Sequence, residues 1–503
     1  MEPKKFCLVL LIVGPIALNS CSGVPGATRP SWIAGAQGGS NPAFALTLRA
    51  IPLAPPPSTN VLSFGLTITG VSFLASTTES INVPLNSSPY QVDLTRLQSD
   101  SAFLGMSTGV PAGTYTKMVI SLTNPVVTYC TQTLGTTACA PGSVTSVTGG
   151  AAVLVITTTP FPLAVTAGKT TGLAVTLDMG ASLTVNPQTQ TVTAVNLGAP
   201  NVLGASLLPP ILSNLPSNAF DFVEDVTGVV TSVNTSAQTV TVQSATGGSI
   251  TAIEGPSTIV SPNCTTFNLG STFTCAKQGQ VASLDTTLNT DGTFSLLEYD
   301  PLAITTGDWI EGTVGLIPST PSQFQLVTNY LVLAPSHSLI GNSLALSSPV
   351  TINLVNPQPF VVDTKGLNVP NTSFSGATDT SALQPGQAVA VHVTAFTTAS
   401  SVAPAVANAD FVYLRFTRVT GSVSSAAPPN TFVLQSLPSF FGLTIPANVQ
   451  LSTTPPSTNF DGIANASGLV TGQPVSIRAL YFGSPTGPSS TPTPFSAATV
   501  RVP

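Results

Sequence analysis

The chain has 503 residues, of which 42% are hydrophobic and 6% are charged, and its formal net charge is −6 at pH 7. The hydrophobic fraction excludes general disorder, and the length predicts three or four domains instead of one core. The 13 Lys and Arg residues are spread along the chain, which excludes nucleic acid as a partner because a binding groove needs a basic cluster. Since ordinary globular proteins are about 25% charged, this surface must consist largely of Ser, Thr, Asn and Gln, as on many secreted β-proteins.

The N-terminus has the pattern of an export signal. Lys4 and Lys5 precede a mainly apolar stretch, 6–18, which is too short to span a ~30 Å hydrocarbon core comfortably. Leu18-Asn19-Ser20-Cys21 follows directly. This segment resembles the bacterial lipobox, in which an aliphatic residue and a small residue stand three positions and one position before the cysteine.

The lipobox resemblance implies that Cys21 is lipidated and that residues 1–20 are removed as a signal peptide. Each buried CH₂ of an acyl chain such as palmitate contributes about 0.8 kcal/mol to membrane binding, so we expect a membrane partner through the lipid anchor. Ser22 stands where an aspartate retains lipoproteins in the inner membrane of some Gram-negative bacteria, which favours the outer membrane. The alternative is a simple secretory peptide with an incidental cysteine. Residues 21–43 are expected to form a flexible tether.

Four further cysteines form two local pairs, Cys130 with Cys139 and Cys264 with Cys275. Each pair lies in a stretch rich in turn-forming residues between apolar segments, which predicts two disulfides that clip loops in an exported protein. Each disulfide would stabilise the fold by about 3 kcal/mol through loop-closure entropy. A zinc site is the rival interpretation, and it is disfavoured because the spacing is not C-x-x-C and both histidines are remote in sequence.

The region 44–195 alternates apolar and polar residues over short stretches, which predicts antiparallel strands with one solvated face. The one helix expected there is a turn or two within 93–104. Three motifs follow one another in this region: Val92-Asp93-Leu94 with Leu97, Val110-Pro111-Ala112-Gly113-Thr114-Tyr115, and Ala167-Gly168-Lys169-Thr170-Thr171. In these motifs and their order the region resembles a bacterial family of unknown function, DUF4382. The resemblance implies an immunoglobulin-like or transthyretin-like β-sandwich and brings neither a catalytic residue nor a ligand.

Residues 196–224 contain several prolines and no clear period, so a linker is predicted there. Beyond it the chain repeats itself loosely. In each unit a strand with a central glycine is followed by a second strand and later by a Gly-Gln pair with another strand: Gly279-Gln280, Gly386-Gln387 and Gly472-Gln473. Because a strand order that recurs three times predicts three similar cores, we expect β-barrel-like repeats at 225–306, 307–415 and 416–503. They resemble the family DUF5666, which implies a small barrel of the oligonucleotide/oligosaccharide-binding (OB) type.

The sequence predicts no catalytic residues, no metal site and no cofactor. Gly105-Met106-Ser107-Thr108-Gly109 matches G-x-S-x-G, but a turn follows where a nucleophile elbow needs a helix, so a loop is expected. His392 is expected on the solvent face of a strand and His337 in a turn, neither with a carboxylate close in sequence. Acidic residues cluster mildly within 221–225 and 298–311, which leaves a paired-carboxylate enzyme or a calcium site as open alternatives.

Trp309 and the pair Phe440-Phe441 are the best candidates for exposed ligand-binding aromatics, with core packing as the alternative. The expected function is that of a non-enzymatic, lipid-anchored cell-envelope protein, acting in adhesion, as a scaffold or in ligand binding, with a polysaccharide or an envelope protein as partner. The alternative is a carbohydrate-binding accessory lipoprotein, and a glycosidase-type enzyme comes third.

Overall fold

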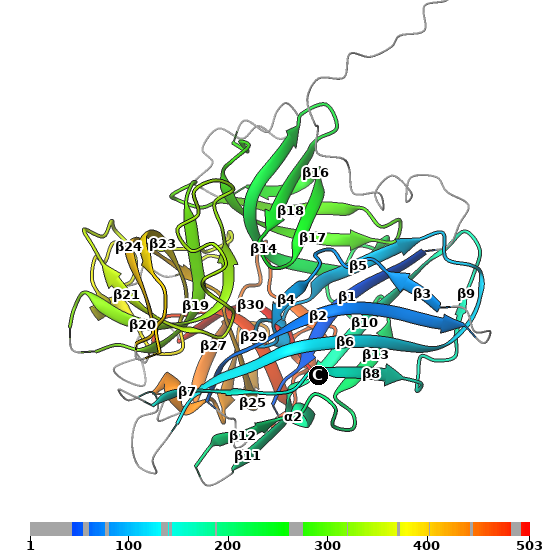
Figure 1. Ribbon diagram of the computed structural model, residues 1–503, viewed down its shortest axis with the longest axis horizontal. Coiled ribbons are helices and arrows are strands. Elements are labelled where there is room, and N and C mark those ends of the chain that lie inside the picture. Colours follow the sequence, from blue (N-terminus) through cyan, green and yellow to red (C-terminus); the bar gives the residue numbers. More distant parts are fainter. Residues whose placement is uncertain are drawn as a thin grey trace, which may run out of the picture.

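The computed structural model describes residues 43–503 apart from 54–59, 76–79, 132–138, 140–142, 187–188, 261–274, 319, 370–372, 402, 443–445 and 484–493. Strands dominate throughout, which confirms the predicted all-β fold class (Figure 1). A sandwich coloured blue through cyan to teal-green lies beside three small barrels coloured green, yellow-green to yellow, and orange to red. No helix in the described ranges is long and apolar enough to cross a membrane.

The N-terminal domain is a sandwich of two sheets that share one core. One sheet has the order β13-β10-β1-β5, in which β1 and β10 are parallel, and the other is built around β2 and β6. A separate hairpin, β11-β12, and a one-turn helix, α2, complete the domain. Its elements are β1(Ala43–Ile51), β2(Val61–Ala75), β3(Ser80–Val83), β4(Tyr90–Asp93), η1(Arg96–Gln98), β5(Ala102–Thr108), β6(Gly113–Cys130), β7(Val144–Thr148), β8(Ala152–Ile156), β9(Leu163–Val165), β10(Thr170–Asp178), α2(Met179–Ser182), β11(Leu183–Asn186), β12(Thr191–Val195) and β13(Leu203–Leu207).

Strand β1 is buried on both faces, which is unusual for a strand of an antiparallel sandwich. Phe44, Leu46 and Leu48 point into the sandwich core. Ala43 and Ala45, on the opposite face, belong to the core of the first barrel. The sandwich and this barrel are therefore packed directly on each other through β1.

Each barrel consists of five main strands in one common order. We number these strands 1 to 5 along the chain. Strand 1 pairs with strands 2 and 4, strand 2 also pairs with strand 3, and strand 4 also pairs with strand 5. Strands 3 and 5 pair in parallel and so close the barrel. This arrangement is that of a small Greek-key barrel of the OB type. The strands are β14(Ala219–Asn234), β15(Thr239–Ser244), β16(Gly248–Val260), β17(Val281–Asn289) and β18(Phe294–Pro301) in barrel 1; β19(Asp308–Leu316), β20(Gln323–Val332), β21(Pro349–Leu354), β23(Ala388–Thr397) and β24(Ala405–Arg415) in barrel 2; β25(Thr417–Ala427), β26(Thr431–Gln435), β27(Ala447–Leu451), β29(Pro474–Tyr481) and β30(Phe495–Arg501) in barrel 3.

Short elements fill the connections of barrels 2 and 3. They are β22(Val361–Val362), η2(Thr380–Ala382), η3(Ser439–Phe441), β28(Asn459–Asp461) and η4(Ala466–Gly468).

The recurring Gly-Gln pair forms the same turn before strand 4 of all three barrels. Gly279, Gly386 and Gly472 have φ between 85° and 88°, a left-handed conformation that glycine adopts without strain. In each turn the glutamine Oε1 accepts a hydrogen bond from the backbone N–H three residues earlier, at 2.7 to 3.0 Å. The glycine N–H donates to strand 1, to Val230, Val314 or Val423. The motif thus holds strands 1 and 4 together at the same point of each barrel.

Two local expectations differ from the structure. The predicted linker 196–224 contains β13, which pairs with β10 as an edge strand, and the start of β14. The prolines of this range lie outside both strands, between which the chain turns. The helix expected within 93–104 is the single 3₁₀ turn η1, because β5 begins at Ala102.

Candidate ligand cleft at a buried ionic junction

Many of the few charged side chains of this protein are buried. Seven of the ten Lys and Arg residues that the structure describes have buried side chains and lie in two ionic clusters where the domains meet: Arg49, Arg96, Lys365, Arg415, Arg418, Arg478 and Arg501. Basic residues are rarely buried unless they are paired. Their positions therefore show where the domains are joined by polar contacts.

Asp225, on β14 of barrel 1, is the centre of the larger cluster, which we call the central network. Its carboxylate contacts four cations from barrels 2 and 3: Lys365 at 3.0 Å, Arg478 at 3.0 Å, Arg415 at 3.5 Å, and Arg418. Burial alone would raise the pKa of Asp225, but these cations together hold it well below its usual range. Asp225 is therefore ionised and anchors both other barrels to barrel 1.

The remaining ion pairs extend the central network to all four domains. Arg96 of the sandwich pairs with Glu311 of barrel 2 at 2.5 Å, and Asp100 of the sandwich pairs with Arg418 of barrel 3 at 2.6 Å. Arg478 of barrel 3 contacts Glu224 at 3.0 Å. Breaking a buried pair by removing one partner is strongly destabilising. This network therefore fixes how the domains sit relative to one another.

Among the described residues, the central network holds more carboxyl groups than cations. Eight carboxyl groups, of Asp100, Glu224, Asp225, Asp285, Glu298, Asp300, Glu311 and Asp363, lie among five cations, of Arg96, Lys365, Arg415, Arg418 and Arg478. Burial raises the pKa of Glu224 and of Asp363 to about 8, although Arg478 and Arg415 respectively oppose the shift. Burial likewise raises the pKa of Glu298 well above its usual range. Protons on these three groups offset the excess negative charge at neutral pH.

A second, smaller cluster joins the sandwich, barrel 1 and barrel 3. Arg49, on β1, donates to Asp221 at 2.6 Å and to Asp461 at 3.0 Å. Arg501, at the end of β30, donates to the same Asp461 at 2.6 Å and to the backbone oxygen of Asp100 at 2.9 Å. The C-terminal strand is thereby tied back to the N-terminal domain.

A cleft opens beside the central network, between the sandwich, barrel 1 and barrel 2. It encloses about 610 Å³, including space open to solvent. Its lining combines apolar side chains with carboxyl, amide and hydroxyl groups from β4, η1, β5, β14, the β15–β16 turn and β20: Tyr90, Gln91, Val92, Asp93, Arg96, Leu97, Asp100, Ser101, Ala102, Phe103, Val223, Glu224, Asp225, Val226, Ser244, Thr246, Gly247, Ile250, Asn329, Tyr330 and Leu346.

The ionic groups that line the cleft are engaged within the protein. Arg96 lies over the Tyr330 ring, 4.4 Å from its centroid, while it pairs with Glu311. Tyr330 itself donates to Thr227 O at 2.8 Å. Asn329 differs, because its buried Oδ1 accepts no hydrogen bond from any residue that the structure describes. A second hollow of about 380 Å³ shares Arg96 and Asn329 with the cleft.

The predicted binding aromatics are not exposed, so that prediction is wrong. Trp309 is 1% exposed and packs on His392 and Phe411. Phe440 and Phe441 are 5% and 4% exposed and belong to the core of barrel 3. The alternative of packing inside the molecule holds: Phe440 and Phe441 lie in the core of barrel 3, and Trp309 lies in an apolar cluster to which barrels 1 and 2 both contribute.

His392 has a partner that the sequence did not predict. Its Nδ1 lies 2.7 Å from Asp410 Oδ1 on the neighbouring strand β24, and its side chain is 14% exposed, so the expected solvent-facing position is wrong. His337 lies in a connection, with φ 57°. Ser107 of the G-x-S-x-G match lies buried within strand β5, not in the expected loop, and a turn and strand β6 follow it.

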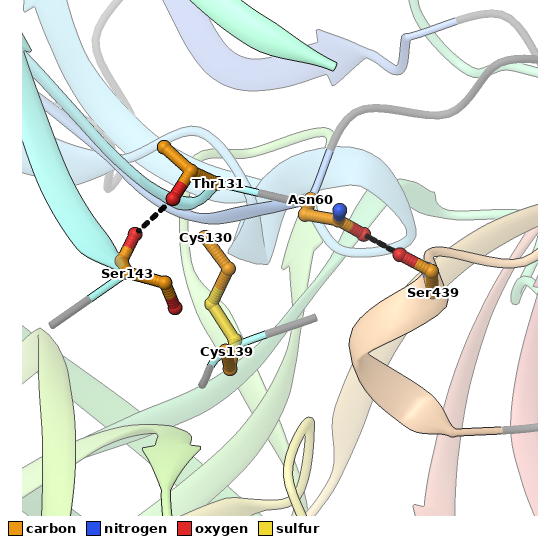
Figure 2. The surroundings of a disulfide bond; sticks show 6 residues. All are labelled: Asn60, Cys130, Thr131, Cys139, Ser143 and Ser439. Atoms are coloured by element: carbon orange, nitrogen blue, oxygen red, sulfur yellow. Dashed lines mark hydrogen bonds between the residues drawn. A yellow bond between two sulfur atoms is a disulfide. The ribbon is translucent and has the colours of Figure 1, made fainter. Parts of the chain in front are cut away.

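The Cys130–Cys139 disulfide forms, with Cα atoms 4.9 Å apart (Figure 2). Both cysteines are buried against the core of barrel 3. Asn60, beside them, accepts two hydrogen bonds from Ser439 of η3, at 2.8 and 2.9 Å, so the disulfide borders an interdomain contact. Cys264 lies outside the described residues, and its pairing with Cys275 stays a prediction. Cys21 also lies outside them.

Sequence reasoning missed the ionic junction, although one signal was available. When the three repeats are aligned on their strand-1 glycines, Asp225 and Arg418 both stand three positions before a glycine, Gly228 and Gly421. Opposite charges at equivalent positions in a chain with 6% charged residues predict pairing between repeats. The structure places these two side chains in direct contact.

Comparison with known proteins gives one match. Residues 53–198 match the family described as "Domain of unknown function (DUF4382)". The chain matches no curated protein and no solved structure. The matched range covers the sandwich from just after β1 to just after β12, and its description assigns no activity. The family match therefore covers most of the N-terminal sandwich.

Proposed function

We propose that this protein is a non-enzymatic, lipid-anchored cell-envelope protein that binds a ligand with a rigid block of four β-domains. Export and attachment through Cys21 rest on the lipobox pattern, with the outer membrane as the favoured location. The Cys130–Cys139 disulfide supports export, because disulfides persist in oxidising compartments. We further propose that the three barrels are repeats of the DUF5666 type.

The observation that carries the proposal is the central network. Interfaces between domains of one chain are usually small enough to allow relative motion. Here Asp225 alone joins barrel 1 to cations of barrels 2 and 3, and Arg96 joins the sandwich to barrel 2. Such fixed domains suit a protein that presents a preformed site, since binding then costs little ordering entropy.

A carbohydrate-binding accessory lipoprotein is the second candidate, and the cleft at the junction favours it. A glycosidase comes third. Its acid and base would have to be carboxyl groups of the cleft, such as Asp100 and Glu224. Because these groups contact Arg418 and Arg478, we expect no turnover of aryl glycosides.

Membrane fractionation tests the anchoring. The Cys21→Ala protein should leave the membrane fraction, whereas the Cys7→Ala protein, which is changed only within the predicted signal peptide, should remain there. If the Cys21→Ala protein stays in the membrane, the lipid anchor is refuted.

Crosslinking in intact envelopes and a glycan and polysaccharide array, with and without calcium, test the binding function. Specific adducts or saturable hits that disappear with heat-unfolded protein are expected. Folded protein that yields neither would overturn the ligand-binding function.

A further inference from the structure

We propose that two copies of this chain associate through β8, an exposed edge strand of the sandwich, and thereby join their sheets into one continuous sheet. This inference goes beyond the proposed function and is independent of which ligand the protein binds. It follows from the free edge of β8, from the exposed valines on that strand, and from the complementarity of the strand to itself.

Strand β8 (Ala152–Ile156) lies at the edge of its sheet. Among the described residues it pairs with β6 and with no other strand, and this pairing runs without a register shift. In Figure 1, β8 lies beside β13, which is itself the edge strand of the other sheet. One row of backbone N–H and C=O groups of β8 therefore points away from β6, and such a row is a template for a further strand.

The outer face of this edge is apolar. Val153 and Val155 are 68% and 53% exposed. The alternate residues Leu154 and Ile156 belong to the sandwich core, so the two valines share the solvent side of the strand. Proteins usually protect an edge strand with a charged residue, a proline or a bulge. Strand β8 has none of these, and another strand that covered its valines would bury apolar surface at an unprotected edge.

The distribution of charge indicates an uncharged partner surface. No Asp, Glu, Lys or Arg occurs between Lys117 and Lys169 in the sequence, a range that contains β7, β8 and β9, the three strands along the same side of β6. A charged partner would find no counter-charge on this edge, whereas a second copy of the edge brings no like charges together. The edge therefore fits a copy of itself.

Strand β8 is also complementary to itself in the antiparallel direction. A two-fold axis through Leu154 would pair all five residues of one β8 with the five of the other. In this register Val153 lies opposite the partner's Val155 on the outer face, and the two-fold symmetry repeats the pair. Cross-strand pairs of β-branched residues stabilise antiparallel sheets. A second copy thus satisfies the backbone of the edge and covers its valines at the same time.

Sedimentation equilibrium of the full-length protein in a density-matched detergent tests the association. We expect a concentration-dependent equilibrium between monomer and dimer. Backbone amides within 152–156 should exchange their hydrogens more slowly in the dimer, because the outward-facing groups gain partners. A chain that stays monomeric at its highest soluble concentration overturns the inference. A dimer in which these amides exchange as fast as in the monomer also overturns it.

Two double variants identify the interface. Val153→Lys/Val155→Lys places lysines opposite lysines in the proposed register and should raise the Kd of the dimer at least about tenfold. Val153→Lys/Val155→Glu places each lysine opposite a glutamate and should dimerise clearly more tightly than the first variant. Both positions are exposed, so the folded monomer should tolerate these changes, which thermal unfolding checks.

A matched control adds the same charge elsewhere. Leu339→Lys/Val470→Lys changes two exposed aliphatic residues of barrels 2 and 3 and should leave the Kd of the dimer unchanged. If Val153→Lys/Val155→Lys dimerises as tightly as the parent protein, or no more weakly than the control, the inference is overturned. Equal Kd values for the two β8 variants would overturn the antiparallel register.

Discussion

Arg478 lies 253 positions after Asp225 in the chain, yet its Nε donates to the Asp225 carboxylate at 3.0 Å with both side chains buried. The contact joins strand 1 of the first barrel to strand 4 of the third. It is one of four cationic contacts made by the same carboxylate. A single carboxylate of barrel 1 therefore contacts cations of both other barrels.

Replacing Asp225 with Asn should destabilise the protein strongly. The amide would keep the volume but leave Lys365, Arg415, Arg418 and Arg478 short of one negative charge in a buried site. Removing one partner of a buried ion pair costs about 3–5 kcal/mol, to be measured as the change in the free energy of unfolding in urea. Asp291→Asn, in the exposed β17–β18 turn, is the control and should change it by less than about 0.5 kcal/mol. Equal effects of the two variants would refute the central role of Asp225.

Stability should fall as the pH rises from about 5 to 8. Glu224 faces Arg478, Asp285, Asp100 and Asp225, and burial raises its pKa to about 8 in the folded state. The unfolded chain releases this proton near pH 4.5, so between these values the folded state binds more protons. The free energy of unfolding then decreases by up to about 1.4 kcal/mol per pH unit for each such group.

Urea titrations at several pH values measure this slope. Asp363, which faces Arg415, Asp300, Lys365 and Asp225, has a pKa raised to about 8 by burial and should add to it. The double variant Glu224→Gln/Asp363→Asn should reduce the slope because it removes two of the three titrations and leaves that of Glu298. A stability that instead increases over this range, or a slope that the double variant leaves intact, would contradict the charge excess of the central network.

Removing the Cys130–Cys139 disulfide should cost about 3 kcal/mol by loop-closure entropy. The double variant Cys130→Ala/Cys139→Ala frees a loop whose cysteines pack against barrel 3. Urea unfolding measures the loss, and proteolysis should cut within 131–143 faster than in the parent protein. Asn60→Ala, which removes only the acceptor for Ser439, is the comparison and should cost less, about 1–2 kcal/mol. Unaltered stability without the disulfide would show that the loop is held by packing alone.

Alanine at the Gly-Gln turns should have graded effects. Gly472 and Gly386 have nearly the same φ, 85° and 88°, so Ala costs about 1–2 kcal/mol of backbone strain at both. An added Cβ at Gly472 would meet open space, whereas at Gly386 it would lie 2.6 Å from Phe441 of barrel 3. Gly386→Ala should therefore destabilise clearly more than Gly472→Ala in thermal unfolding. The reverse order would refute the close packing of barrel 2 on η3.

The sequence by itself determined what local chain chemistry controls. Period-two alternation in segments such as Phe44 to Leu48 predicted strands, since successive side chains of a strand point to opposite faces. The Gly-Gln pairs revealed the three repeats because each encodes one turn with a left-handed glycine. Cys130 and Cys139 could be paired because only nine positions separate them.

Only the tertiary structure decided which surfaces of these strands are covered. The sequence leaves both exposure and packing open for Trp309, and the structure shows that barrel 2 and its neighbours enclose it. The partners in the ionic clusters are up to 412 positions apart, as for Arg49 and Asp461. Burial and ion pairing depend on how whole domains dock, and alternation along one strand carries no information about the neighbour that covers its outer face. The cleft with Asn329 exists for the same reason, since no single domain contains it.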